Sequence, residues 1–237
     1  MIPYLGNKST ISNFILPNCP KNPEYFIEPF GGMMGLYFSL NLKEYPDTKF
    51  VYNDINPLNS NLFTQMKKDK FIGSILDTKV DKDIFMMSYD NLSSGSKEDK
   101  ALAWLIILVC SDMKDLMGKK FKGSPHFDIL KYKLPRYTQY YKKLIVHNMD
   151  YKKLIKKYDE YNIFWYFDPP YVGYENYYTN HNFNSQSHIE LYDQIKLLKG
   201  NWLLSYYNFP EMKDWYKDYK ITSTKHNLGE EYLIIKS

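Results

Sequence analysis

The feature that most constrains the fold is an unbroken apolar run, Ile163 to Phe167 (IFWYF), that ends in Asp168-Pro169-Pro170-Tyr171. A strand without polar alternation is typical of the centre of a parallel sheet, where helices cover both faces. The two prolines then remove two backbone donors, so the chain has to leave the sheet as a stiff extended segment. We therefore expect an α/β domain with a polar tetrapeptide at the carboxyl end of a central strand.

Further strand signals on both sides of this run predict a mostly parallel sheet that ends in an antiparallel hairpin around Gly229. The other predicted strands are Tyr25 to Phe30, Phe50 to Ile55, Leu144 to Asn148, Trp202 to Tyr206, Lys220 to Thr224 and Tyr232 to Ile235.

Helix signals alternate with these strands. We expect helices over Met33 to Leu42, after the Asn56-Pro57 cap, and from a capping box at Ser187 to Glu190 as far as Gly200. His188 is interpreted as a capping residue, and Ser93 to Lys100 (SSGSKEDK) as a mobile loop.

The length of 237 residues suits one large α/β domain or a core with a small insert. The strand and helix alternation stops after Lys70 and resumes at Leu144, and the residues between mix helix-like stretches with Gly, Pro and Lys-rich loops. We interpret 1–70 and 144–237 as the main domain and 71–143 as a small, mainly helical insert.

Several classes of protein are excluded. The longest apolar run, Ala101 to Cys110, has half the length that a bilayer crossing needs, and the N-terminal residues lack the pattern of a secretory signal. Two cysteines cannot build a disulfide framework or a cysteine-rich zinc site. We expect a protein without a membrane partner, in a reducing cytoplasm.

The net charge of +4 is distributed unevenly along the chain. Residues 114–157 contain thirteen Lys or Arg against three Asp or Glu. Lys-rich faces are usually only solvated. A solvated outer face of a helix and contact with a partner are equally open for Lys152, Lys153, Lys156 and Lys157. In the insert, cations alternate with aromatic residues, which favours contact with phosphates of a nucleic acid.

Polar residues and glycines follow three of the predicted strands, where ligands bind in sheets of this kind. Asp54 stands 22 positions beyond Gly32, a spacing that places a carboxylate on ribose hydroxyls in nucleotide-binding folds. Glu28 beside the glycine turn would repel a pyrophosphate but suits an amino group. These residues predict a cationic, phosphate-free nucleoside, although a tight turn without a ligand would look the same.

The tetrapeptide Asp168 to Tyr171 is more specific. Its carboxylate and unpaired carbonyls are acceptors for an amino group, and Tyr171 adds a platform for a flat ring. We interpret it as a grip on a nucleobase amine. The alternative is a strand end with a solvated Asp and a packing Tyr.

Five motifs in the same order resemble those of the DNA adenine N6-methyltransferases of the Dam type, the alpha group. They are Tyr4-Leu5-Gly6-Asn7-Lys8, Phe26 to Gly32, Asn53-Asp54-Ile55-Asn56, Asp168 to Tyr171, and Leu204-Ser205-Tyr206. The resemblance covers nearly the whole chain and implies a Rossmann-like methyltransferase fold that uses S-adenosylmethionine, with a target-recognition insert.

The resemblance also implies roles for individual residues. Asp54 would hold the ribose of the cofactor, and Asp150 with Tyr151 would contact its adenine. The residues implied in cofactor binding are Tyr4, Gly6, Asn7, Lys8, Glu28, Pro29, Phe30, Gly31, Gly32, Asp54, Ile55, Asp150, Tyr151 and Asp168. Met33 and Met34 stand where the family often has glycine.

The implied catalytic residues are Asp168, Pro169, Pro170 and Tyr171. Asp168 and the Pro169 carbonyl would accept hydrogen bonds from the N6 amine of an adenine flipped out of the duplex, while Tyr171 stacks on the base. The chemistry requires no metal. Tyr174, Tyr177 and Tyr178 could cover the base or merely pack, and His181 is interpreted as an ordinary loop residue.

We assign DNA contact to the cations and one aromatic residue of the insert: Lys119, Lys120, Lys122, Lys131, Lys133, Arg136 and Tyr137. The expected function is site-specific methylation of adenine N6 in double-stranded DNA by a monomer or weak dimer. The alternatives are methylation of RNA adenine and a catalytically silent DNA-binding protein. The family's Arg, Asn and Gly-rich recognition signature is missing between 114 and 136, which leaves the recognised sequence open.

Overall fold

A computed structural model describes residues 2, 8–112, 120–160, 162–175, 183–226 and 229–236. Within these ranges seven strands form one sheet in the order β3-β2-β1-β4-β5-β7-β6. They are β1 (Tyr25–Glu28), β2 (Lys49–Asn53), β3 (Leu144–His147), β4 (Ile163–Phe167), β5 (Asn201–Tyr207), β6 (Lys220–His226) and β7 (Gly229–Lys236). Strands β1 to β5 pair in parallel and β7 pairs antiparallel with β5 and β6, so the predicted α/β class and C-terminal hairpin are confirmed.

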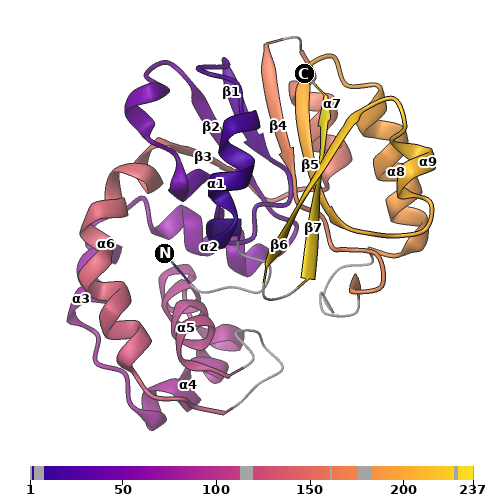
Figure 1. Cartoon of the computed structure of the whole chain (residues 1–237). Coiled ribbons are helices and arrows are strands. Elements are labelled where there is room, and N and C mark those ends of the chain that lie inside the picture. Colours follow the sequence, from indigo (N-terminus) through magenta and orange to yellow (C-terminus); the bar gives the residue numbers. More distant parts are fainter. Residues whose placement is uncertain are drawn as a thin grey trace.

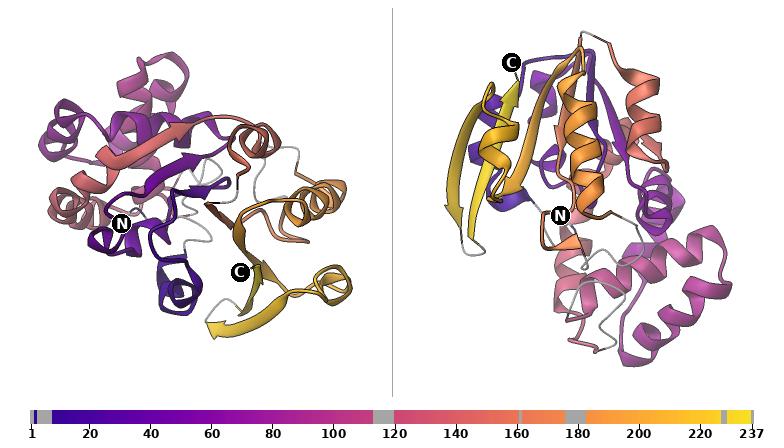
Figure 2. Two further views of the ribbon diagram at one scale, coloured as in Figure 1. Left: turned by 90° about the horizontal axis from the view of Figure 1, so that it is seen from above. Right: turned by 90° about the vertical axis from the view of Figure 1, so that its right-hand side faces the viewer.

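Helices lie on both sides of this sheet (Figures 1 and 2). They are α1 (Ser12–Ile15), α2 (Pro57–Gln65), α3 (Asp69–Asp77), α4 (Lys82–Ser94), α5 (Lys97–Cys110), α6 (Pro125–Lys143), α7 (Tyr151–Tyr158), α8 (Ser185–Lys196) and α9 (Met212–Trp215). Short 3-10 helices span Lys8–Thr10, Leu16–Asn18, Tyr37–Ser39 and Leu42–Glu44. None of the described helices combines the length and apolar character that crossing a bilayer requires.

Strand β4 is buried along its whole length, as its sequence predicts. Phe164 and Tyr166 point into a cluster that includes side chains of α2, α5 and α6. Trp165 and Phe167 point into a second cluster, which includes side chains of α7 and α8. Successive side chains of β4 therefore pack into two hydrophobic cores, one on each face of the sheet.

The predicted helix over Met33 to Leu42 is wrong, because only two short 3-10 helices form in this region. Met34 has a φ of 49°, outside the range of a right-handed helix. The backbone N–H of Tyr37 donates to Oε1 of Glu28 at 3.2 Å, so a side chain takes part in shaping the turn. Nearly all of the segment is buried, and an apolar run without a polar face is consistent with either conformation.

The expected mobile loop over Ser93 to Lys100 is also wrong. Helix α4 continues to Ser94 and α5 begins at Lys97. Ser96 and Asp99 form a capping box, in which the Asp99 N–H donates to the Ser96 hydroxyl at 3.2 Å and the Ser96 N–H donates to the Asp99 carboxylate at 3.0 Å.

Helix α8 begins three residues earlier than predicted, because Asn184 is its cap and Ser187 is the other member of the capping box. His188 is consequently not a capping residue but a buried one. The N-cap expected before α2 is confirmed, since the Asn56 side chain accepts from the Leu58 N–H at 3.0 Å ahead of Pro57.

Helices α3 to α6 correspond to the predicted insert and gather beside and below one end of the sheet (Figure 1). The insert is not separate from the sheet in its packing. Tyr141 near the end of α6 lies 5.0 Å from Phe38 and 5.8 Å from Phe63 between ring centroids. The boundaries at 71 and 143 stay a prediction.

Candidate functional site

Three strand ends meet at one edge of the sheet. Strand β1 lies between β2 and β4 and is parallel to both, so their carboxyl ends adjoin. The Gly31 N–H donates to the Asn53 carbonyl at 2.7 Å, and the Gly32 N–H donates to Oδ2 of Asp54 at 2.8 Å. Asp168 follows β4 at the same edge. The structure thus brings together the three motifs that the sequence singles out.

Asp168 belongs to a cluster with Lys8, Tyr171 and Glu231. Its Oδ1 is 2.9 Å from the Lys8 ammonium and accepts from the Tyr171 hydroxyl at 3.1 Å. Glu231 of β7 lies 3.3 Å from the same ammonium and also accepts from the Tyr171 hydroxyl. The Lys8 side chain is 7% exposed and the Asp168 side chain is 20% exposed, so Asp168 is the less enclosed of the two.

Burial sets the electrostatics of this cluster. It raises the pKa of Asp168 to about 6, with the Lys8 charge opposing this rise and the Glu231 charge adding to it. Burial, together with the charge of Asp168, raises the pKa of Glu28 well above its ordinary value. Burial alone would lower the pKa of Lys8, but the two carboxylates outweigh it and the pKa is raised. The Lys8 ammonium is therefore the shared ion-pair partner of the Asp168 and Glu231 carboxylates. Glu28, in contrast, favours its neutral form.

The glycine turn after β1 is held tightly. A Cβ atom on Gly31 would lie 2.5 Å from the ring of Tyr52, so only glycine fits there. The Asn53 side chain donates to the carbonyls of Pro29 and Met149, each at 2.9 Å, and accepts from the Met149 N–H at 3.1 Å. These bonds fasten the ends of β1, β2 and β3 to one another.

Asp54 stabilises this turn, in addition to the ribose contact that is predicted for it. Its Oδ1 accepts from the Asn56 N–H at 2.7 Å, and its Oδ2 accepts from the Gly32 N–H at 2.8 Å and from the Asn59 amide at 3.2 Å. The ribose contact of Asp54 stays a prediction.

An apolar platform lies beside Asp54. Ile55 is 44% exposed, and the ring of the half-buried Phe30 lies 5.2 Å from that of Tyr151. The Tyr151 hydroxyl is buried and has no hydrogen-bond partner among the described residues. Asp150 caps α7 by accepting from the N–H of Lys152 at 2.8 Å. This part of the site therefore combines exposed apolar surface with an unsatisfied buried hydroxyl.

Tyr171 is almost fully buried in this structure, at 8% exposure. Its ring packs edge-on against Tyr207 at 4.6 Å between centroids, and the Lys8 ammonium lies 4.8 Å from its centre. Pro169 and Pro170 are buried as well. Stacking of Tyr171 on a base stays a prediction, and it requires the Lys8 ammonium to leave the ring face.

The predicted DNA contacts divide into two groups. Lys120, Lys122, Lys133 and Arg136 are exposed, but the Lys131 ammonium donates to the Thr78 carbonyl at 2.9 Å. The half-buried Tyr137 packs edge-on against Phe38 at 5.6 Å. The lysines of α7 form its exposed face, as expected. Several predicted residues lie outside the described ones: Tyr4, Gly6, Asn7, Lys119, Tyr177, Tyr178 and His181.

Sequence reasoning missed two groups at this edge. Glu231 is a buried carboxylate next to the apolar run of β7, and that contrast was a usable signal. His188 bridges the Tyr206 hydroxyl at 2.7 Å and the Glu175 carboxylate at 3.0 Å, and thereby ties the segment after the tetrapeptide to β5. Nothing in the local pattern around His188 pointed to this bridge.

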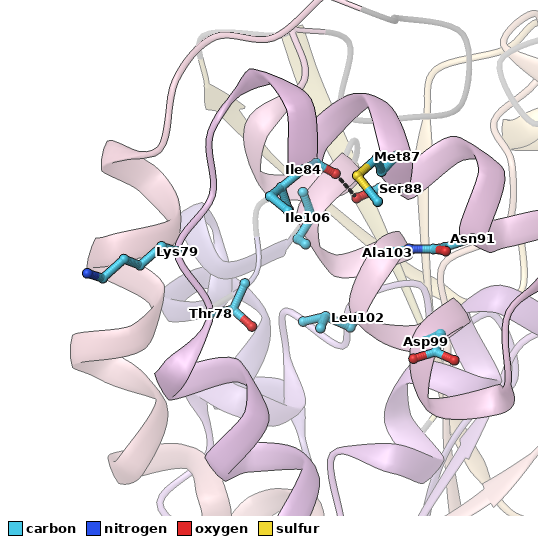
Figure 3. A pocket seen from close by; sticks show the side chains of 10 residues that line it. All are labelled: Thr78, Lys79, Ile84, Met87, Ser88, Asn91, Asp99, Leu102, Ala103 and Ile106. Atoms are coloured by element: carbon cyan, nitrogen blue, oxygen red, sulfur yellow. Dashed lines mark hydrogen bonds between the residues drawn. The ribbon is translucent and has the colours of Figure 1, made fainter.

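A separate pocket of about 350 Å³ lies along α4 and α5 (Figure 3). Its lining residues fall between Thr78 and Ile106, so none belongs to the three strand ends. Among the residues that the structure describes, no group of three or more His, Cys, Asp or Glu is placed to hold a metal ion.

Comparison with known families gives one match. A family model described as "D12 class N6 adenine-specific DNA methyltransferase" matches residues 4–228. Among curated proteins, none matches the chain significantly.

Proposed function

Because the chain belongs to the D12 class of N6 adenine-specific DNA methyltransferases, we propose that it takes its methyl group from S-adenosylmethionine at the carboxyl edge of β1, β2 and β4. The chain is an enzyme that methylates adenine N6 at specific sites in DNA, and its sheet is the Rossmann-like one of such enzymes. The proposal concerns the donor, the residues and the mode of DNA contact.

The acidic and apolar groups around the glycine turn would hold the cofactor. Glu28 and the turn from Phe30 to Gly32 would border its amino acid end, and Asp54 its ribose. Ile55 and Tyr151 would line the place of its adenine. S-adenosylmethionine supplies a methyl group that is already activated on a sulfonium sulfur, so the protein has to position the acceptor rather than activate the donor.

The single observation that carries the proposal is the setting of Asp168. Lys8 and Tyr171 both bind Oδ1 of its carboxylate, and the Asp168 side chain keeps an exposed fraction of 20%. We propose that the Asp168 carboxylate and the Pro169 carbonyl accept hydrogen bonds from the N6 amine. Such bonds favour a tetrahedral nitrogen, which raises the electron density on a poor nucleophile.

An adenine inside a duplex cannot reach this edge, so we propose that the base is extruded and that Tyr171 lines its pocket. Stacking on an aromatic ring contributes roughly 1–3 kcal/mol, which offsets part of the cost of unstacking. Lys8 covers the Tyr171 ring in this structure. Entry of the base would therefore move the ammonium towards the two carboxylates that already bind it.

We further propose that residues 71–143 recognise the DNA and that the protein acts as a monomer or weak dimer. Lys120, Lys122, Lys133 and Arg136 are exposed and would contact phosphates. Bacterial cytoplasm or that of a phage-infected host is the compartment where the enzyme would meet its substrate. The free thiols of Cys19 and Cys110 suit such a reducing compartment.

Replacement of Asp168 by alanine tests the proposal. Asp168→Ala should abolish methyl transfer to duplex DNA while calorimetry still detects binding of S-adenosylmethionine. The matched control is Asp193→Ala, which removes an exposed carboxylate of α8 that pairs with Lys196. Full activity of Asp168→Ala, or an equal loss in the control, would refute the assignment. RNA offered beside duplex DNA to the native enzyme should accept no methyl group.

A further inference from the structure

Glu231 is a buried carboxylate far along the chain from the tetrapeptide. It is 2% exposed and pairs across the sheet with Tyr207 of β5. Strand β5 separates β7 from β4, yet the Glu231 side chain reaches both the Lys8 ammonium at 3.3 Å and the Tyr171 hydroxyl. A carboxylate in such a place is costly unless its partners compensate for the lost water.

The geometry shows what this carboxylate does to its neighbours. The Tyr171 hydroxyl has one proton to donate, and two carboxylates lie within reach of it. The hydroxyl donates to Glu231 and lies 3.1 Å from Oδ1 of Asp168. The Lys8 ammonium is divided between the same two carboxylates. Glu231 therefore takes up donors that would otherwise be committed to Asp168.

We propose that Glu231 is a positioning residue for methyl transfer: it anchors Tyr171 and Lys8 so that the Asp168 carboxylate keeps an acceptor for the N6 amine. This inference rests on the proposed role of Asp168. Glu231 acts through its neighbours, because its side chain is enclosed behind Lys8 and Tyr171.

The charge of Glu231 also bears on Asp168. The titratable groups that face Asp168 come from several elements: Lys8 of the first 3-10 helix, Glu28 of β1, Tyr166 of β4, Tyr171 after β4, Tyr206 and Tyr207 of β5, and Glu231 of β7. Burial is the main cause of the raised pKa of Asp168. The negative charge of Glu231 raises this pKa further, whereas the charge of Lys8 lowers it. Neutralisation of Glu231 should therefore let Asp168 stay ionised to lower pH.

The experiment compares Glu231→Gln and Glu231→Ala with Glu230→Gln, a half-buried neighbour on the same strand that bonds to Ser223 and Tyr232. Methyl transfer to duplex DNA is measured across pH, together with KM for DNA and calorimetric binding of S-adenosylmethionine. Glu231→Gln should move the acid limb of kcat to lower pH. Glu231→Ala should lower kcat by about 10- to 100-fold, with KM for DNA and cofactor affinity almost unchanged.

Each outcome bears on one claim. An acid limb of Glu231→Gln that coincides with the native one overturns the inference, as does a kcat of Glu231→Ala within about twofold of native. If Glu231→Ala does not fold, the pH profile of Glu231→Gln decides alone. Full activity of Asp168→Ala would instead refute the proposed function, which separates the two failures.

Discussion

Removal of the Lys8 ammonium should destabilise the fold strongly. Lys8 is 6% exposed and lies 2.9 Å from Asp168 and 3.3 Å from Glu231, so Lys8→Met would leave two carboxylates in a buried site without this cation. Loss of one partner of a buried pair costs about 3–5 kcal/mol. For a chain of this size 1 kcal/mol shifts Tm by roughly 2–4 °C, so we expect Tm to fall by about 6–20 °C.

The loss should depend on pH. The charge of Lys8 lowers the pKa of Asp168 in the native protein, so the variant raises that pKa above its value of about 6. A carboxyl whose pKa is raised by folding binds its proton more tightly in the folded state, and acidification therefore relieves the cost of burying it. The Tm difference between the two proteins should be largest at alkaline pH and should narrow as pH falls through the raised pKa.

Scanning calorimetry at about pH 8 and about pH 5.5 measures this difference. The matched control is Lys152→Met, which breaks an ion pair with Glu190 whose two side chains are 44% and 41% exposed. Exposed pairs contribute about 0–1 kcal/mol, so the control should melt close to the native protein at both pH values. A Lys8→Met variant that melts like the control, or a Tm difference independent of pH, would refute the reasoning.

Three further changes test the rest of the site. Gly31→Ala places a methyl group 2.5 Å from the Tyr52 ring. Thermal unfolding should therefore show that the free energy of unfolding falls by about 1–3 kcal/mol, and calorimetry should show a lower affinity for the cofactor. An unchanged Tm would contradict this expectation. Asn53→Ala removes three bonds to backbone groups that are buried or partly buried. It should lower the free energy of unfolding in denaturant by on the order of 3 kcal/mol, whereas a loss below about 1 kcal/mol would show that these bonds are dispensable. Joint replacement of Lys133 and Arg136 by alanine should reduce the slope of log K for DNA against log salt by about 1.8, and an unchanged slope would place the phosphate contacts elsewhere.

The main part of the fold could be predicted because its signals are local. Strand β4 is apolar at every position, and the structure buries every one of them. The meeting of Gly32, Asp54 and Asp168 follows from topology, since parallel neighbouring strands deliver their carboxyl ends to one edge. The resemblance to a family added the order of the motifs, which the match over 4–228 supports.

What could not be predicted depends on contacts between distant residues. The segment after the glycine turn reads as a helix, but a left-handed Met34 and the bond from Tyr37 to Glu28 decide against one. Glu231 enters the cluster because β7 lies antiparallel beside β5, a pairing that no spacing in the sequence reveals. His188 reads as part of a cap because Ser187 precedes it, although the cap itself starts at Asn184.

Side-chain hydrogen bonds connect the predicted catalytic part of the chain with the predicted insert. The Trp104 indole of α5 donates to the Asn59 side chain at 2.8 Å, Asn59 donates to Asp54 at 3.2 Å, and Asp54 accepts from the Gly32 N–H at 2.8 Å. Trp104 is 2% exposed, so separation from Asn59 would leave its buried indole N–H unsatisfied at a cost of about 1–3 kcal/mol. The fold therefore resists displacement of α5 relative to the glycine turn.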